Sequence, residues 1–148
     1  MRVKRSILVD LDGTIANLEH RRSWIQSNPK NWKAFYANVE NDVPIQPVID
    51  IVVTLWQSGW DIVFCSGREE IYREKTEKWL RQHVVAPNNL YMRKKGDYRD
   101  DAVVKIELLE QIRADGFNPL IAFDDRNRVV DAWRANGIIC AQVAPGDF

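Results

Sequence analysis

Short hydrophobic runs alternate along the chain with longer segments in which every third or fourth residue is apolar. The short runs are bounded by turn residues and predict strands at residues 6–10, 60–65, 89–92, 119–123 and 138–143. Helix-length segments lie between most of them. Because strand and helix alternate, the pattern predicts an α/β fold, with a mostly parallel sheet that is covered by helices on both faces.

Two of the helix-length segments carry a clear apolar stripe. In 69–84 the stripe consists of Ile71, Trp79, Leu80 and Val84, and in 101–115 it consists of Val104, Leu108 and Ile112. Gly116 and Gly137 follow two of the predicted helices, where a helix commonly ends in a left-handed glycine.

The segment 17–43 interrupts the alternation. It is rich in charge and in aromatic residues, namely Trp24, Trp32, Phe35 and Tyr36. It predicts one or two short helices inserted after the first strand. Two interpretations are equally favoured: satellite packing against the core, or a small cap that covers an active site.

Bulk composition describes a globular protein. A chain of 148 residues with 45% hydrophobic and 28% charged residues fits one domain, 1–148. No apolar run reaches membrane-spanning length and no signal peptide is evident, so no membrane partner is expected. Basic and acidic residues balance at 21 each, so nothing marks a generic nucleic-acid binder, and a polyanion would have to be bound locally. Cys65 and Cys140 lie in apolar segments and predict buried thiols and a cytoplasmic location.

The most informative motif follows the first strand. Asp10 and Asp12 come at its carboxyl end, the edge of an open α/β sheet at which chemistry takes place. Gly13 then permits a tight reversal. A calcium loop is excluded because the acidic pattern does not continue past Gly13. Two acids this close suit a reaction in which one attacks phosphorus and the other moves protons.

Asp124 and Asp125 repeat the theme after the strand at 119–123. Four acids at two strand ends repel one another unless a cation lies between them, and oxygen ligands favour Mg²⁺. The simpler interpretation is a helix N-cap at Asp125, and one residue can serve both purposes.

Two further groups suit a phosphate ester. Ser66, Gly67 and Arg68 end the 60–65 strand with a hydroxyl, an amide and a guanidinium that together can bind phosphate, although Ser-Gly alone is usually a turn. Asp101 and Lys105 are four residues apart on a predicted helix. In isolation they form a surface ion pair, but beside the other motifs Lys105 becomes a cation for the nucleophile, oriented by Asp101.

Basic and aromatic residues interleave after the third strand, at Tyr91, Arg93, Lys94, Lys95, Tyr98 and Arg99. A solvated loop is the common explanation of such a run. The alternative is a short groove that binds a nucleic-acid backbone.

The order of these motifs resembles the haloacid dehalogenase superfamily of phosphotransferases: Asp10-Leu-Asp-Gly-Thr14, then Ser66, then Lys105, then Asp124-Asp125. The resemblance implies a Rossmann-like sheet and Mg²⁺-dependent phosphoryl transfer through Asp10. Asp12 would be the general acid and base, with its backbone carbonyl on the metal. Asp124 would be a direct ligand, and Asp125 a direct or water-mediated one.

A narrower resemblance covers the first strand and most of 44–148. The runs 66–69, 96–105, 123–130 and 146–148 are similar to the phosphatase half of phage-type polynucleotide kinase/phosphatases. That resemblance implies removal of 3′-phosphates from DNA or RNA ends. It assigns function to Asp10, Asp12, Ser66, Arg68, Arg93, Asp101, Lys105, Asp124 and Asp125.

Two features separate the chain from that family. No Gly-x-x-x-x-Gly-Lys-Ser/Thr loop occurs in these residues, so no kinase half is expected in them, and a kinase or ligase partner encoded separately is left open. The 17–43 segment is also longer and more aromatic. The alternatives to a polynucleotide 3′-phosphatase are a phosphatase of small phosphate esters or nucleotides and a non-catalytic phosphate-binding module.

Overall fold

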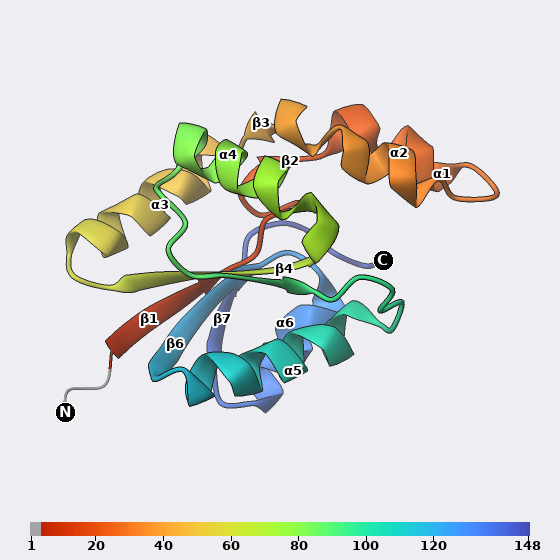
Figure 1. Ribbon diagram of the computed structural model, residues 1–148. Coiled ribbons are helices and arrows are strands. Elements are labelled where there is room, and N and C mark those ends of the chain that lie inside the picture. The colour runs from red at the N-terminus through yellow and green to blue at the C-terminus, as the bar shows by residue number, and fades with distance from the viewer. Residues whose placement is uncertain (1–3) are drawn as a thin grey trace.

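Residues 4–148 of the computed structural model are described here, and they are built around one five-stranded parallel sheet with strand order β5-β4-β1-β6-β7 (Figure 1). The strands are β1 (Lys4–Val9), β4 (Asp61–Glu69), β5 (Leu90–Arg93), β6 (Phe117–Asp124) and β7 (Ile139–Gln142). All five strands predicted from the sequence are present. The parallel α/β architecture is therefore confirmed.

Helices cover both faces of the sheet (Figure 1). One face carries α3 (Gln46–Gln57), the turn η3 (Glu70–Tyr72) and α4 (Arg73–His83), and the other carries α5 (Asp101–Ala114) and α6 (Asn127–Ala135). Side chains of the central strand alternate between the two resulting cores, because successive residues of a strand point to opposite faces. Ile7 and Val9 pack with Trp79 of α4, whereas Leu8 packs with Leu109 of α5 and Trp133 of α6.

Most residues of the two predicted apolar stripes are buried or half-buried. Ile71 is the exception: it lies in η3, before α4 begins, and is 55% exposed. In α5 the fully buried position is Leu109, and its neighbour Leu108 is half-buried. Gly116 and Gly137 end α5 and α6 with positive φ angles of 96° and 81°, as predicted.

The 17–43 segment contains the short helices that the sequence predicts, and a short antiparallel pair closes its base. Its elements are η1 (Glu19–Arg21), α1 (Ser23–Gln26), α2 (Trp32–Ala37) and η2 (Val39–Asn41), between β2 (Ala16–Asn17) and β3 (Val43–Pro44). Asn17 pairs with Val43 in that β2–β3 pair. The segment packs on α4, where the Trp79 indole N–H donates to the Asp42 carbonyl at 2.9 Å. In Figure 1 α1 and α2 extend beyond the carboxyl edge of the sheet.

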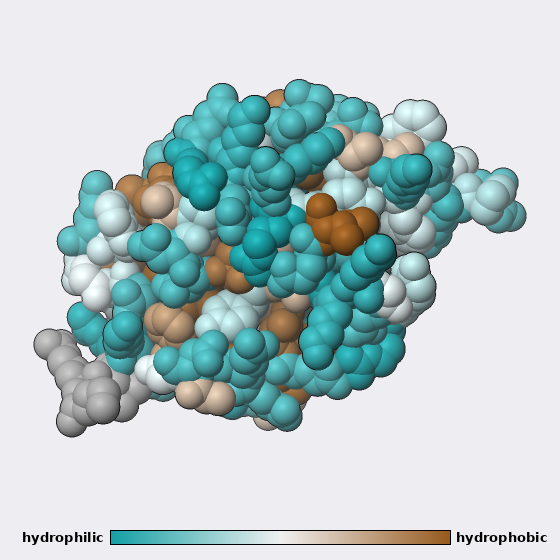
Figure 2. Space-filling view, viewed as in Figure 1, coloured by the Kyte–Doolittle hydropathy of each residue, from teal (hydrophilic) through white to brown (hydrophobic). Residues whose placement is uncertain are grey.

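The surface and the thiols agree with the bulk properties. Figure 2 shows a largely hydrophilic face on which hydrophobic groups form only small patches. Within residues 4–148, none of the helices combines the length and apolarity that crossing a bilayer requires. Cys65 and Cys140 are both free and buried, as predicted, and burial raises the pKa of each thiol.

Candidate active site

The carboxyl ends of β1, β4 and β6 bring separate motifs to one edge of the sheet. Val9, the last residue of β1, pairs with Phe64 in β4 and with Phe123 in β6. The next residue, Asp10, donates its backbone N–H to the Phe123 carbonyl at 3.1 Å. Asp10 therefore lies level with Asp124, which is why two acids 114 positions apart come together.

Lys105 connects the acids of this edge. Its ammonium donates to Asp10 Oδ1 at 2.8 Å and to Asp124 Oδ2 at 3.0 Å, and it lies 3.7 Å from Asp101 Oδ2. The side chain is almost fully buried. Burial alone would lower the pKa of Lys105, but the charges of Asp10, Asp101 and Asp124 outweigh it and raise the pKa well above its ordinary value. Lys105 is thus a fixed cation beside the proposed nucleophile, in the position that the sequence predicts.

Asp125 completes a cluster of three buried carboxylates. One oxygen each of Asp10, Asp124 and Asp125 lies within 4.8 Å of the others. Thr14 links two of them: its hydroxyl Oγ1 donates to Asp10 Oδ2 at 2.9 Å and lies 3.3 Å from Asp125 Oδ1. Gly13 makes this approach possible, because a Cβ on its backbone would collide with Asp125 Oδ2.

The charge of this cluster suits a divalent cation. Three carboxylates and one ammonium leave two negative charges without a partner in a buried site. Burial, with the neighbouring Asp124, raises the pKa of both Asp10 and Asp125. Oxygen ligands of this kind and number fit a hard ion such as Mg²⁺. The Asp12 carboxylate is not part of the cluster. The predicted contribution of its backbone carbonyl stays a prediction.

Asp12 turns instead toward two buried guanidinium groups. Arg68 donates from Nη2 to Asp12 Oδ1 at 2.7 Å and from Nε to Oδ2 at 3.2 Å. Arg21 donates from Nη2 to Asp12 Oδ1 at 2.5 Å. Burial by itself raises the pKa of Asp12, but the charges of Arg68 and Arg21 outweigh it and hold the pKa well below the ordinary value of 3.8. Asp12 is therefore ionised at neutral pH.

A second acid, Asp42, holds the same two arginines from the other side. It accepts from Arg21 Nε and Nη2, both at 2.7 Å, and from Arg68 Nη2 at 3.2 Å. His20 Nε2 lies 2.6 Å from Asp42 Oδ1. The sequence reasoning missed Arg21 and Asp42. Both come from the 17–43 segment, where an isolated arginine or aspartate has no motif to mark it.

The phosphate-binding trio proposed at the end of β4 is only partly available. Ser66 is buried, and its hydroxyl accepts the backbone N–H of Arg68 at 3.1 Å. The Arg68 guanidinium is 1% exposed and is bound to Asp12, Asp42 and Thr76. Arg68 therefore contacts the site through its ion pair with Asp12, rather than by offering a free guanidinium to a phosphate. At Gly67 a Cβ would collide with Asp101 Oδ1, so glycine is required for Asp101 to approach β4.

Arg93 lies at the site but is engaged with its own chain. It donates to the carbonyls of Gly67, Asp97 and Arg99 at 2.7–3.0 Å and to Asp101 Oδ1 at 3.3 Å. These contacts tie the loop before α5 to the end of β4. The neighbouring Lys94 and Lys95 are exposed. The proposed basic groove therefore lacks a free Arg93 guanidinium.

The interpretation of Asp125 as a helix cap is wrong. Helix α6 begins after Arg126, which gives no side-chain cap. The amides that precede the helix are bound by Asp124, whose Oδ1 accepts from Asp125 N at 2.9 Å and from Arg126 N at 3.4 Å. The Trp133 indole N–H donates to its Oδ2 at 3.2 Å. This leaves the Asp125 carboxylate free to face Asp10.

Comparison with known sequences agrees with this geometry. Residues 4–148 match the family model described as the polynucleotide kinase PNKP phosphatase domain. The chain is also 32% identical over 132 residues to a protein of Autographa californica nuclear polyhedrosis virus that is described as a bifunctional polynucleotide kinase/RNA ligase. The match covers 88% of this chain and 18% of the viral protein.

Solved structures give the same picture. A chain of the Pnkp1/Rnl/Hen1 RNA repair complex superposes with a TM-score of 0.86 at 32% identity, covering 99% of this chain and 44% of that one. A class C acid phosphatase from Bacillus anthracis has a TM-score of 0.69 at 18% identity, covering 99% of this chain and 68% of that one, and this likeness concerns the fold. The chain spans less than half the length of the viral protein and of the Pnkp1/Rnl/Hen1 chain.

Proposed function

Because the chain belongs to the family of polynucleotide kinase PNKP phosphatase domains, we propose that it removes 3′-phosphates from polynucleotide ends through an aspartyl-phosphate on Asp10. It is a phosphatase domain of the haloacid dehalogenase type, a phosphoric monoester hydrolase. One observation carries the catalytic proposal. A buried carboxylate ends the central strand, bonded to a buried ammonium and placed beside two further acids.

The nucleophile is Asp10. The Lys105 ammonium holds Asp10 Oδ1, which leaves Oδ2, bonded to Thr14, on the other side of the carboxylate. In the first step an Asp10 oxygen attacks phosphorus, the ester oxygen leaves with a proton that Asp12 passes to it from the substrate phosphate, and an acyl phosphate remains on Asp10. In the second step Asp12 takes a proton from water, the water oxygen attacks phosphorus, and inorganic phosphate leaves with Asp10 restored. Asp12 then releases that proton to solvent and is ionised again.

Arg21 and Arg68 determine the protonation state of Asp12 before the reaction begins. Arg21 and Arg68 hold it ionised, which is the state that the second step requires. The proton for the first leaving group therefore enters with the substrate, since a phosphate monoester has a second pKa of about 6 and carries a proton in part of its population.

Residues for a metal are present at the same place. Asp10, Asp124 and Asp125 would hold Mg²⁺, with the Asp12 carbonyl as a further ligand. Bound there, it supplies positive charge that lessens the repulsion between a phosphate and the attacking carboxylate. Lys105 supplies a second positive charge beside Asp10, and Asp101 lies close enough to Lys105 to orient its ammonium.

The substrate proposal depends on the relatives. Two of them are named for a polynucleotide kinase/RNA ligase and for an RNA repair complex, so RNA ends are the first substrates to test. A kinase or ligase acting on the same ends and a cytoplasmic location stay predictions. A small phosphate ester is the second candidate, and it is favoured by the engagement of Arg93 with backbone carbonyls.

The intermediate can be tested by trapping. Substrate labelled with ³²P is mixed with enzyme and quenched in acid within a turnover. We expect label on the protein that hydroxylamine releases, mapped to the peptide containing Asp10 and absent in Asp10→Asn. Label on another residue, or turnover retained in Asp10→Asn, would refute Asp10 as nucleophile.

The substrate can be tested with a panel measured in Mg²⁺ and in excess chelator. The panel compares an RNA and a DNA oligonucleotide 3′-phosphate with a nucleoside 3′-monophosphate and glycerophosphate. We expect the oligonucleotides to have the highest kcat/KM and chelator to abolish activity. Preference for glycerophosphate would support the second candidate, and full activity in chelator would exclude the metal.

A further inference from the structure

Three aromatic rings from two separate elements stack into a ladder near the acids. Tyr36 of α2 stacks on Tyr72 of η3, with centroids 5.1 Å apart and ring planes 30° apart. Trp32 stacks on Tyr36 at 6.0 Å and 21°. We call Trp32, Tyr36 and Tyr72 the aromatic ladder. It joins the 17–43 segment to the body of the domain.

Both ends of the ladder connect to Asp12 through its arginines. On the α2 side, the Arg21 guanidinium lies 4.2 Å from the ring centroid of Phe35, the neighbour of Tyr36. On the η3 side, the Tyr72 carbonyl accepts from Thr76 Oγ1 at 2.8 Å, and Arg68 Nη1 donates to that same hydroxyl at 3.1 Å. On the η3 side, three successive contacts therefore link the ladder to Asp12.

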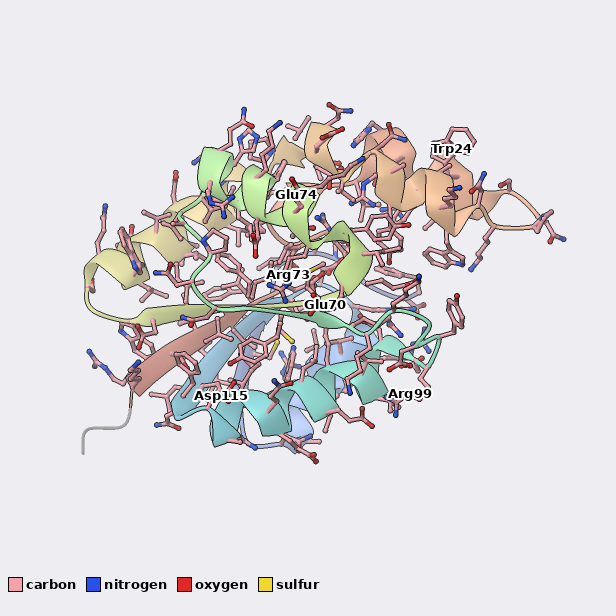
Figure 3. The ribbon with its side chains drawn as sticks, in the orientation of Figure 1. Trp24, Glu70, Arg73, Glu74, Arg99 and Asp115 are labelled. Carbon is pink, nitrogen blue, oxygen red and sulfur yellow. The ribbon has the colours of Figure 1, made fainter. Side chains whose placement is uncertain are left out.

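The η3 end is also fixed to the sheet. Arg73 forms an ion pair with Glu70 at 2.7 Å and donates to the Leu90 carbonyl in β5 at 2.9 Å. Figure 3 shows Arg73 and Glu70 together at the start of α4. Tyr72 is thus carried on an anchored turn rather than on a free loop.

Tyr36 of the ladder lies within electrostatic reach of two acids of the site. Among the described residues, the Tyr36 hydroxyl has no hydrogen-bond partner. Burial, and then the charges of Asp12 and Asp101, raise the pKa of Tyr36 above its ordinary value of 10.0.

Packing accounts for only part of these aromatics. Phe35 and Val39 already fill the contact between the segment and the domain, at 4% and 0% exposed. Trp32 contributes little to that core, since 48% of it is exposed. Lys30 lies 5.6 Å from its ring centroid, and neither Lys30 nor Lys33 has a carboxylate within ion-pair distance among residues 4–148. An exposed ring beside a cation suits a ligand with flat bases and a phosphate backbone.

We propose that the aromatic ladder stacks the terminal nucleobases of a polynucleotide whose 3′-phosphate lies at Asp10, with Lys30 and Lys33 near its backbone. This rests on the proposed function and extends it, since it assigns polynucleotide recognition to the 17–43 segment. The exposed ring of Trp32 is the first stacking surface. Base stacking on an aromatic ring changes affinity by about 5- to 150-fold per base.

The test compares an oligonucleotide 3′-phosphate with the same oligonucleotide carrying abasic residues at its 3′ end. In Trp32→Leu and Tyr72→Leu we expect kcat/KM on the intact substrate to fall by about 5- to 150-fold, mainly through KM. On the abasic substrate the variants should equal wild type. Trp32→Phe, which keeps a ring, should recover most of the loss. Equal losses on both substrates, or no loss on either, would overturn the proposal.

Trp24→Leu is the matched control. Trp24 lies on α1 in the same segment (Figure 3) and is 43% exposed. It is not one of the stacked rings of the ladder. We expect it to leave both substrates unchanged. A loss in Trp24→Leu as large as in Trp32→Leu would mean a general effect of the segment, and this would also overturn the proposal.

A binding measurement separates this proposal from the function it extends. Oligonucleotide is titrated into Asp10→Asn protein, with and without Trp32→Leu, and tryptophan fluorescence is followed. Quenching that is lost with Trp32→Leu supports the ladder even if wild-type enzyme prefers glycerophosphate, in which case only the proposed substrate fails. Quenching that is unchanged in Trp32→Leu refutes the ladder whatever the enzyme hydrolyses. Quenching by an abasic oligonucleotide to the same extent refutes it as well.

Discussion

The buried network of two arginines and two aspartates makes a sharp prediction at Asp42. Arg21, Arg68, Asp12 and Asp42 balance in charge, and Asp42 is completely inaccessible through its side chain. The substitution Asp42→Asn keeps the shape and one acceptor oxygen but removes the negative charge. It leaves two buried guanidinium groups facing the single carboxylate of Asp12.

The size of the effect follows from the contacts. Asp42 accepts three hydrogen bonds from the two guanidinium groups, and His20 lies at its other edge. Removing one partner of a buried ion pair costs about 3–5 kcal/mol. Since asparagine keeps part of the geometry, we expect the lower end, about 3 kcal/mol. For a domain of this size that is a fall in Tm of about 6–12 °C.

Activity should fall together with stability. Arg21 and Arg68 position Asp12, and a shift of a catalytic group by about 1 Å can cost about 100-fold in rate. We therefore expect kcat of Asp42→Asn to fall by about 10- to 100-fold on every phosphate ester. KM for a small ester should change little, because Asp42 lies behind the arginines.

The assays are thermal unfolding followed by circular dichroism, and steady-state kinetics well below the Tm of each variant. Asp50→Asn is the control, because Asp50 is an exposed acid on α3 whose carboxylate accepts, among residues 4–148, only from Gln46 at 2.8 Å. It should change neither quantity. A wild-type Tm in Asp42→Asn would refute the energetic reasoning. A lowered Tm with wild-type kcat would restrict Asp42 to stability.

Three further outcomes test other parts of the site. Lys105→Met should lower kcat by about 100-fold or more on all esters, because Asp10 loses its buried cation; equal rates would exclude an electrostatic role. Gly67→Ala should lower kcat with little change in Tm, since the new Cβ displaces the Asp101 carboxylate, and this is checked by comparing the two measurements. The pKa of Asp12 lies below 3.8 in the folded state, so its charge contributes stability above that pH that is lost on acidification. Asp12→Asn should therefore have a lower Tm than wild type at neutral pH, and the difference should shrink below about pH 3.8; a difference independent of pH would contradict this.

The core of the site could be predicted because strand geometry fixes it. Asp10 and Asp124 each follow an apolar run, and parallel strands end at one edge, so their meeting needs only the correct sheet order. Asp101 and Lys105 are helix neighbours by spacing alone. Backbone periodicity carries all of this information.

The remaining groups could not be predicted, because irregular backbone has no period. Arg21 and Asp42 reach Asp12 from a segment of short turns, and only the folded path brings them there. Arg93 shows the converse. It lies in a suggestive basic run, but its donors are taken by carbonyls of Gly67, Asp97 and Arg99, and carbonyls are present at every residue and leave no trace in the sequence.

The β2–β3 pair has a consequence for how such domains diversify. Since Asn17 and Val43 are neighbours, the intervening stretch leaves and rejoins the scaffold at a single point. Its length and composition can drift, or be exchanged between homologues, without disturbing the order of the main strands. Arg21 and Asp42 limit this exchange. A substituted segment without an equivalent guanidinium and counter-ion would remove one of the two arginines that bind the Asp12 carboxylate. Chimeras should therefore fold and stay active when the middle of the segment is exchanged, and lose activity when the parts that carry Arg21 and Asp42 are exchanged.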